Sequence, residues 1–257
     1  MNKLQQKFND KKEGLLTVYF TAGYPNLEDT ATIIKELDAS GADIIEVGMP
    51  FSDPVADGPT IQVSNLKALQ NGMNIQKLFD QLKAIKDEVT IPILLMGYIN
   101  PVWKYGLERF MQACEDCGVS GLILPDIPLN EFVADYKPLY EKHHLSSVFL
   151  ITPQTSNERI KAYDEVCNGF IYMVSSASTT GANKTIDQDK QILYFERVNS
   201  LNLKSPMQIG FNIKDKVSFA YATQYANGGI IGSAFIKKLA EEGDLKMKVS
   251  EFVKSIR

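Results

Sequence analysis

Two carboxylates, Glu46 and Asp57, stand where an acid and a base could act on one substrate. Glu46 lies in the apolar run Ala42–Met49, whose alternation puts Ile44, Glu46 and Gly48 on one face of a strand. A buried charge costs several kcal/mol unless it is paired or neutralised. Asp57 follows on a loop rich in proline and glycine, just beyond the end of that strand. Two carboxyl groups that differ in burial are typical of acid and base catalysis, and a buried glutamate with a structural partner is the alternative.

Glycine-containing segments near the end of the chain predict a phosphate site. Gly210-Phe211-Asn212 ends one predicted strand, and Gly232-Ser233 leads from the last predicted strand into a helix. Glycine lets the backbone approach a ligand, and free N–H groups at a helix start favour an anion. Taken alone, Gly232 could equally support a tight turn. The occurrence of such a segment after two successive strands favours phosphate.

The elements that would position these groups alternate along the whole chain. Short apolar runs predict strands at Leu15–Ala22, Asp43–Met49, Ile93–Gly97, Gly121–Leu124, Ser147–Ile151, Gly169–Val174, Met207–Phe211 and Gly229–Gly232. Amphipathic patterns predict helices at Leu27–Ser40, Ile75–Glu88, Leu107–Asp116, Glu131–His144, Glu158–Val166, Gln191–Asn202, Lys214–Ala226 and Phe235–Arg257. Eight strand-then-helix units without a linker predict one α/β domain, residues 1–257, folded as a single (β/α)8 TIM barrel. A short amphipathic pattern at the start predicts an extra N-terminal helix.

An open, doubly wound sheet is the alternative fold. Its first strand-to-helix turn should carry the pattern G-x-G-x-x-G. The corresponding turn here, residues 22–26, has one glycine, and the similar pattern at 228–232 enters a strand instead of leaving one. We therefore favour the closed barrel, in which the residues that end the strands gather at the catalytic face.

Composition excludes several classes of function. The formal net charge of -4 provides no basic field for nucleic acid or for an anionic membrane. The longest apolar stretches, such as Ile91–Ile99, are far short of a membrane span, and the N-terminus lacks a signal peptide's apolar core. Three cysteines indicate a reducing compartment, and Cys114 and Cys117 fit buried thiols in a helix better than metal ligands. We expect a cytoplasmic protein without a bound metal.

The segment Glu46–Gln62, EVGMPFSDPVADGPTIQ, closely resembles the signature of the tryptophan synthase alpha subunit family. Other matching segments are Tyr19–Gly23, Met96–Pro101, Leu124–Pro128, Tyr172–Ser175, Thr180-Gly181 and Ile231–Ala234. They occur in order over nearly the whole chain. The resemblance implies a barrel that cleaves indole-3-glycerol phosphate to indole and glyceraldehyde 3-phosphate, a retro-aldol lyase reaction of tryptophan biosynthesis.

The resemblance also implies a partner and no cofactor in this chain. A beta subunit that holds pyridoxal phosphate (PLP) would receive the indole in an alpha2beta2 complex and convert it to tryptophan with serine. Two other hypotheses stay open. One is a stand-alone lyase that releases free indole, which would use the same catalytic residues. The other is a regulatory partner whose main role is to activate a beta subunit.

Carried over residue by residue, the resemblance implies three catalytic positions. Glu46 would move protons at ring carbon C3 and at the substrate hydroxyl, with its pKa raised by burial. Asp57 would stay ionised and stabilise positive charge toward the indole N–H. Tyr172 would orient Glu46 or the substrate hydroxyls. Thr180, in the loop at 175–184, would tie that loop to Asp57 on closure.

The remaining substrate contacts implied by the resemblance divide between the two ends of the substrate. The phosphate contacts are Gly181, Asn212, Gly232 and Ser233, and the residues lining the indole slot are Tyr19, Ile61, Met96 and Phe211. The partner surface would lie at the barrel mouth and include Pro50, Asp53, Asn100 and Pro128.

Three positions depart from the family pattern. Ser176 and Ser178 stand where the family has Arg and Gly, and Asn212 replaces a glycine of the phosphate loop. We expect catalysis to survive, because backbone N–H groups bind phosphate whatever the side chain and Asn tolerates a left-handed backbone better than most residues. Loop closure and communication with a partner are the properties that these substitutions would change.

Overall fold

The computed structural model describes residues 1–175, 184–210 and 212–257, apart from the side chains of residues 184–188. The described residues form one parallel sheet in the order β5-β4-β3-β2-β1-β9-β8-β7-β6. The strands are β1 (Leu15–Thr21), β2 (Ile44–Gly48), β3 (Ile93–Met96), β4 (Gly121–Ile123), β5 (Ser146–Ser147), β6 (Phe149–Ile151), β7 (Ile171–Val174), β8 (Met207–Gly210) and β9 (Gly228–Ile231).

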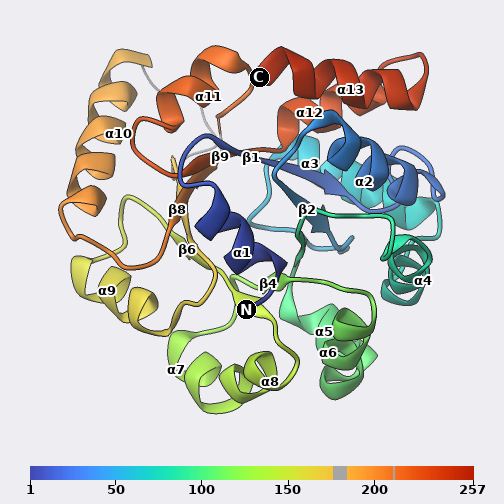
Figure 1. Ribbon diagram of the computed structural model, residues 1–257, viewed down its shortest axis with the longest axis horizontal. Coiled ribbons are helices and arrows are strands. Elements are labelled where there is room, and N and C mark those ends of the chain that lie inside the picture. Colours follow the sequence, from blue (N-terminus) through green and yellow to red (C-terminus); the bar gives the residue numbers. More distant parts are fainter. Residues whose placement is uncertain (176–183, 211) are drawn as a thin grey trace.

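The sheet curves into a nearly closed barrel (Figure 1). β5 and β6 correspond to one predicted strand, and they stand at the two ends of the strand order with Val148 between them. The strand that opens the sheet on one side therefore continues directly into the strand on the other side. The predicted (β/α)8 barrel is confirmed, and the alternative of an open doubly wound sheet is wrong.

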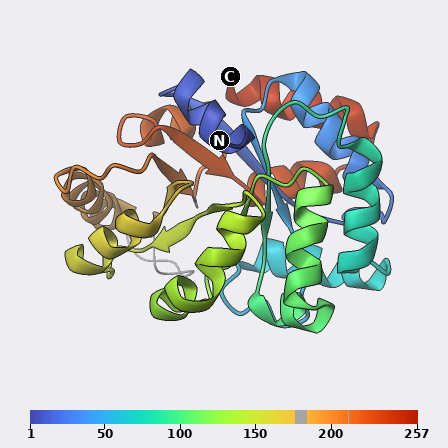
Figure 2. The same cartoon turned by 60° about the horizontal axis from the view of Figure 1, so that its bottom comes forward.

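Helices cover the outside of the barrel (Figures 1 and 2). They are α1 (Lys3–Asp10), α2 (Asp29–Ser40), α3 (Pro59–Gln70), α4 (Ile75–Ile85), α5 (Ile99–Tyr105), α6 (Leu107–Asp116), α7 (Leu129–Glu131), the π-helical turn η1 (Phe132–Tyr136), α8 (Lys137–Lys142), α9 (Asn157–Val166), α10 (Lys184–Asn199), α11 (Lys216–Ala222), α12 (Ser233–Ala240) and α13 (Leu245–Ile256). Among these helices, none has both the length and the apolar character needed to cross a membrane.

The sequence patterns missed two helices and joined two others. α3 escaped prediction because its outward face carries the exposed side chains Val63 and Leu66, which blur its polar side. α5 is only seven residues long and contains Pro101 near its start. The predicted helix 235–257 is in fact α12 and α13, which are separated by a turn containing Gly243 at φ 118°.

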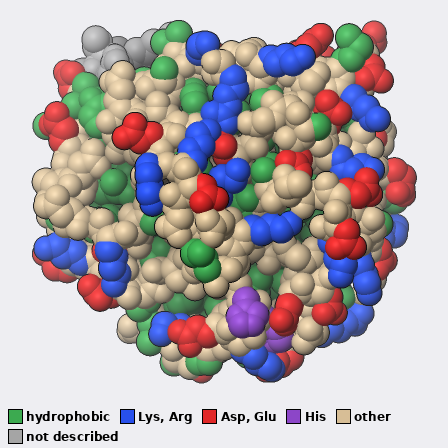
Figure 3. Space-filling view, in the orientation of Figure 1, with side chains coloured by type: hydrophobic (Ala, Val, Ile, Leu, Met, Phe, Trp, Pro, Cys, Tyr) green, Lys and Arg blue, Asp and Glu red, His purple; other side chains and the backbone are tan. Residues whose placement is uncertain are grey.

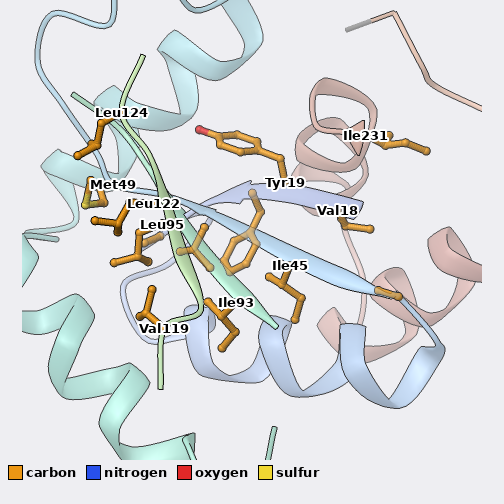
Figure 4. Close-up of a cluster of buried hydrophobic side chains, with 14 of the residues drawn as sticks. Val18, Tyr19, Ile45, Met49, Ile93, Leu95, Val119, Leu122, Leu124 and Ile231 are labelled. Carbon is orange, nitrogen blue, oxygen red and sulfur yellow. The ribbon is translucent and has the colours of Figure 1, made fainter. Parts of the chain in front are cut away.

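Alternation along each strand separates two apolar clusters. One lies between the strands and the outer helices and includes Val18, Ile45 and Leu95. In Figure 4 these side chains lie among the strands and helices, whereas the Tyr19 side chain extends from the other side of β1. The second cluster fills the barrel interior and includes Ile44. The predicted facing of Ile44 and Ile45 is therefore confirmed.

Helix α1 closes the N-terminal end of the barrel, which confirms the predicted extra helix. Its buried residues Leu4 and Phe8 join the interior cluster, and the Phe8 ring lies 5.7 Å from that of Phe170. Asn2 caps the helix and also donates from its side-chain amide to the Ser120 carbonyl, at 2.8 Å. Figure 1 shows α1 lying across the barrel axis, with the N-terminus near the centre.

The surface that surrounds α1 carries charges of both signs side by side (Figure 3). Lys and Arg side chains alternate with Asp and Glu side chains over this face, so that no broad basic patch forms on it. This mixture agrees with the near-neutral composition of the chain.

Candidate active site

Glu46 lies in the middle of β2, inside the barrel. Its neighbours in register are Tyr19 on β1 and Leu94 on β3. The side chain is fully buried, and neither carboxyl oxygen has a hydrogen-bond partner among the described residues. Burial, reinforced by the nearby charge of Asp57, raises the pKa of Glu46 to about 8. Glu46 is therefore largely a neutral acid at pH 7, able to give up its proton to a bound molecule.

Asp57 lies on the loop between β2 and α3 and is partly buried. Burial raises its pKa to about 6, and a hydrogen bond from the Tyr98 hydroxyl opposes that rise. Asp57 is therefore mostly ionised at pH 7. The Tyr98 hydroxyl also accepts a hydrogen bond from the Ala56 backbone N–H at 3.1 Å, and the Tyr98 ring centre lies 5.1 Å from that of Phe51. Two carboxyl groups in one site thus favour opposite protonation states.

Two buried tyrosines, Tyr19 and Tyr172, project into the barrel, and glycines make room for them. A Cβ atom at Gly48 would collide with the Tyr19 hydroxyl, and one at Gly210 would collide with the Tyr172 hydroxyl. Burial raises the pKa of both phenols, and the nearby Glu46 raises them further. Both tyrosines therefore keep their protons and can donate hydrogen bonds. The glycines of two predicted functional segments serve the shape of this site.

The segments predicted to bind phosphate follow β8 and β9. Gly232 is the N-cap of α12, and Ser233 is the exposed first residue of that helix. Asn212 has φ 60°, in the left-handed region, as expected for a residue in place of glycine. Gly232 also lies against Tyr19, since a Cβ atom there would be 3.1 Å from the tyrosine ring. This arrangement joins the start of α12 to the carboxylate site through one side chain.

Apart from Tyr19, two of the predicted indole contacts fall within the described residues. Met96 ends β3 and packs against both apolar clusters, and Ile61 lies in the first turn of α3. Several other predicted positions lie outside the described residues: Thr180, Gly181 and Phe211, together with the family departures Ser176 and Ser178.

Three polar residues at the site or elsewhere inside the barrel received no role from the sequence. Tyr98 directly follows the end of a predicted strand and lies within the matching segment Met96–Pro101, but neither signal gave it a role. Thr17 and Gln208 are fully buried inside the barrel, and the Thr17 hydroxyl donates to Gln208 Oε1 at 2.6 Å. Alternation within β1 could have predicted that Thr17 faces inward, but the partner on a distant strand requires the register.

The described residues contain no group of three or more His, Cys, Asp or Glu side chains arranged to hold a metal ion. Cys114 and Cys117 are both buried and free, and Cys117 donates to the Phe79 carbonyl at 3.4 Å. The prediction that both are buried thiols is confirmed, but only Cys114 lies within helix α6, and Cys117 is its C-cap residue.

Comparison with known proteins places the chain in one family. A model of the family described as tryptophan synthase alpha chain matches residues 5–256. A tryptophan synthase alpha chain from Flavobacterium psychrophilum is 54% identical over 256 residues, covering 100% of both chains. The crystal structure of tryptophan synthase subunit alpha from Legionella pneumophila is 31% identical, with a TM-score of 0.88, and the match covers 100% of this chain and 97% of that one. A tryptophan synthase structure from M. tuberculosis in an aminoacrylate-bound form is 28% identical, with a TM-score of 0.86 and coverage of 100% and 98%. With a match of this length and identity, the chain belongs to the tryptophan synthase alpha chain family, the lyases that cleave indole-3-glycerol phosphate.

Proposed function

We propose that Glu46 and Asp57 divide the retro-aldol reaction between them as a proton carrier and a charge stabiliser. The observation that carries this proposal is the contrast in their ionisation: Glu46, with a pKa of about 8, holds a proton at pH 7, and Asp57, with a pKa of about 6, does not. Indole leaves readily only after C3 of the ring is protonated, because the ring then accepts the electrons of the broken carbon–carbon bond. A buried neutral carboxyl group is suited to give that proton.

The proposed steps balance with Glu46 alone as proton carrier. Its carboxyl proton goes to C3 of the indole ring, which places positive charge toward the ring nitrogen. Asp57 stabilises that charge through the ring N–H. The Glu46 carboxylate then takes the proton of the hydroxyl next to the ring, the C3–carbon bond breaks, and an aldehyde forms. Glu46 ends protonated, as it began, and no metal or cofactor takes part.

The remaining residues would hold the substrate along the barrel axis. Tyr172 keeps its phenol proton, so it can donate a hydrogen bond to Glu46 or to the substrate hydroxyls. We place the phosphate at Gly181, Asn212, Gly232 and Ser233, and the indole ring among Tyr19, Ile61, Met96 and Phe211. Thr180 would tie the loop at 175–184 to Asp57 when the substrate is bound. We further propose that residues 1–257 act as a single domain.

We propose a PLP-containing beta subunit as the partner, in an alpha2beta2 complex in the cytoplasm. The named relatives include tryptophan synthases, and in this family the alpha chain itself uses no cofactor. Trp103 on α5 is 52% exposed although its indole N–H donates to the Tyr136 hydroxyl. Val133, three residues before Tyr136 in the sequence, is 44% exposed. Large apolar side chains exposed on helices that follow the strand ends favour a protein contact there.

Steady-state cleavage of indole-3-glycerol phosphate by the purified chain, with and without a beta subunit, tests the partner. We expect slow cleavage alone and a large rise with the partner. Fast cleavage that the partner leaves unchanged would instead indicate the stand-alone lyase that releases free indole. If the isolated chain and the complex both fail to cleave the substrate, the regulatory hypothesis gains support.

Substitutions in the same assay test the catalytic roles. Glu46→Gln should reduce kcat by ~10²–10⁴, roughly 3–5 kcal/mol of barrier, because the amide carries no transferable proton. Asp57→Asn should also reduce kcat severely. Near-normal turnover by either folded variant would contradict the role of that residue. Charge reversal at the exposed Asp53 should weaken activation by the partner more than basal cleavage, and an equal loss of both would argue against an interface there.

A further inference from the structure

Asp57 stands on a loop, and the described side chains that fix this loop come from the following helix α3 and from the end of the neighbouring strand β3. Besides turns within the loop, its residues receive hydrogen bonds from two side chains elsewhere. Gln62 donates to the Asp57 backbone carbonyl at 2.8 Å. Tyr98 accepts from the Ala56 N–H at 3.1 Å, and its hydroxyl lies close enough to the Asp57 carboxylate to lower the pKa of that group. The Tyr98 ring also packs on Phe51, at the other end of the loop.

Tyr98 itself stands on rigid backbone. It is the N-cap residue of α5 and directly follows Gly97, whose N–H donates to the Ile123 carbonyl at 3.1 Å. The next residue, Ile99, donates its N–H to both carboxylate oxygens of Asp126, at 3.1 and 3.0 Å. The backbone on both sides of Tyr98 is therefore held by the neighbouring strand and its loop. One side chain with a fixed base touches both ends of the loop that carries Asp57.

We propose that Tyr98 is a positioning residue for the lyase reaction, whose hydroxyl and ring hold the loop that carries Asp57 and direct its carboxylate toward the substrate. The inference rests on the catalytic role proposed for Asp57. A misplacement of a catalytic group by about 1 Å can cost on the order of a hundredfold in rate. The Tyr98 side chain is placed to prevent such a displacement, since its hydroxyl accepts from the backbone N–H next to Asp57 and its ring packs on Phe51 at the other end of the loop.

Tyr98→Phe is the direct test, because it keeps the ring that packs on Phe51 and removes only the hydroxyl. The Tyr98 hydroxyl lowers the pKa of Asp57, so without it the pKa of Asp57 should lie above about 6. The acidic limb of the kcat/KM profile should therefore move to higher pH, and kcat at pH 7 should fall roughly tenfold. Tyr105→Phe is a matched control on the same helix, since its hydroxyl donates to Gln76 at 2.9 Å on the surface.

A second set of variants separates this inference from the proposed role of Asp57. In an Asp57→Asn background, adding Tyr98→Phe should change kcat little, because the carboxylate that Tyr98 serves is gone. NMR titration of the Asp57 carboxyl in the substrate-free chain should show the same upward pKa shift in Tyr98→Phe. An unmoved acidic limb and an unmoved carboxyl titration would overturn the role of Tyr98 alone. Near-normal turnover of Asp57→Asn would overturn the role of Asp57 itself.

Discussion

Replacing Glu46 by Gln should make the folded chain more stable than the wild type at alkaline pH, in contrast to most substitutions at buried positions. The Glu46 side chain is fully buried without a hydrogen-bond partner among the described residues. A carboxyl group in that environment is tolerated as a neutral acid and strongly disfavoured as an anion. Gln has a similar shape and never ionises, so it removes the alkaline penalty while it also removes the transferable proton.

The size of the effect follows from proton binding in the two states. In the unfolded chain Glu46 loses its proton near pH 4.5, whereas in the folded chain it keeps the proton up to about pH 8. Between these values the folded state binds more protons, so the free energy of unfolding falls as pH rises, by about 1.4 kcal/mol per pH unit. The accumulated loss is about 5 kcal/mol, present in full above pH 8 and absent below pH 4.5. The Gln variant does not share this loss.

Urea unfolding of wild type and Glu46→Gln at several pH values between 5 and 9, followed by circular dichroism, measures the difference. We expect the free energies of unfolding of the two proteins to be similar near pH 5 and to differ by a steadily growing amount up to about pH 8. Glu88→Gln serves as the control, because Glu88 is exposed in an ion pair with Lys35. Its substitution should change the free energy of unfolding by about 1 kcal/mol or less at any pH. A difference in free energy of unfolding between wild type and Glu46→Gln that stays constant with pH would refute the idea that Glu46 is a neutral acid in the folded chain.

Three further outcomes test the shape and chemistry of the site. Gly48→Ala should destabilise the chain by about 1–3 kcal/mol in urea unfolding, because the new Cβ would collide with the Tyr19 hydroxyl oxygen. Adding Tyr19→Phe should restore only part of this stability, because the ring carbon Cζ would still lie 2.7 Å from the new Cβ. Asn212→Gly should keep the KM for indole-3-glycerol phosphate, whereas Asn212→Val, β-branched at a left-handed φ, should cost on the order of 1–3 kcal/mol in unfolding and raise KM. The kcat/KM profile of the wild type should fall as pH rises through about 8, because Glu46 then lacks its proton, and a profile that stays flat to pH 10 would contradict its role as the acid.

The sequence could predict the barrel because its strands are short and apolar and its helices mostly have one apolar side. The position of Glu46 inside the barrel followed from simple alternation in β2, which the structure reproduces. Helix α3 could not be predicted in the same way, because exposed Val63 and Leu66 remove the contrast between its faces. Periodicity measures that contrast, and it fails where a surface is apolar.

The part of the site that depends on contacts between distant segments lay beyond sequence patterns. The partnership of Tyr98 with Asp57 joins the ends of two adjacent strands, and the pair Thr17 and Gln208 joins residues 191 positions apart. Each residue is unremarkable within its own segment, and only the strand order brings them together. Family resemblance supplied the role of Tyr172, whose residue type alone would not have marked it as functional, and it singled out Asn212 within a segment that the strand pattern had already assigned to phosphate.

The closure of the barrel base by α1 has a consequence for isotope exchange. Leu4 and Phe8 pack into the interior cluster and fill that end of the barrel, so we expect water to reach Glu46 through the mouth at the other end. Once a substrate occupies the mouth, the proton held by Glu46 is cut off from solvent until a product leaves. Enzyme equilibrated in D2O and then mixed with substrate in H2O should therefore place deuterium on C3 of the indole formed in the first turnover, to a degree set by how fast the empty site exchanges with water. A helix that packs the far end of the barrel thereby decides which proton the catalytic acid delivers.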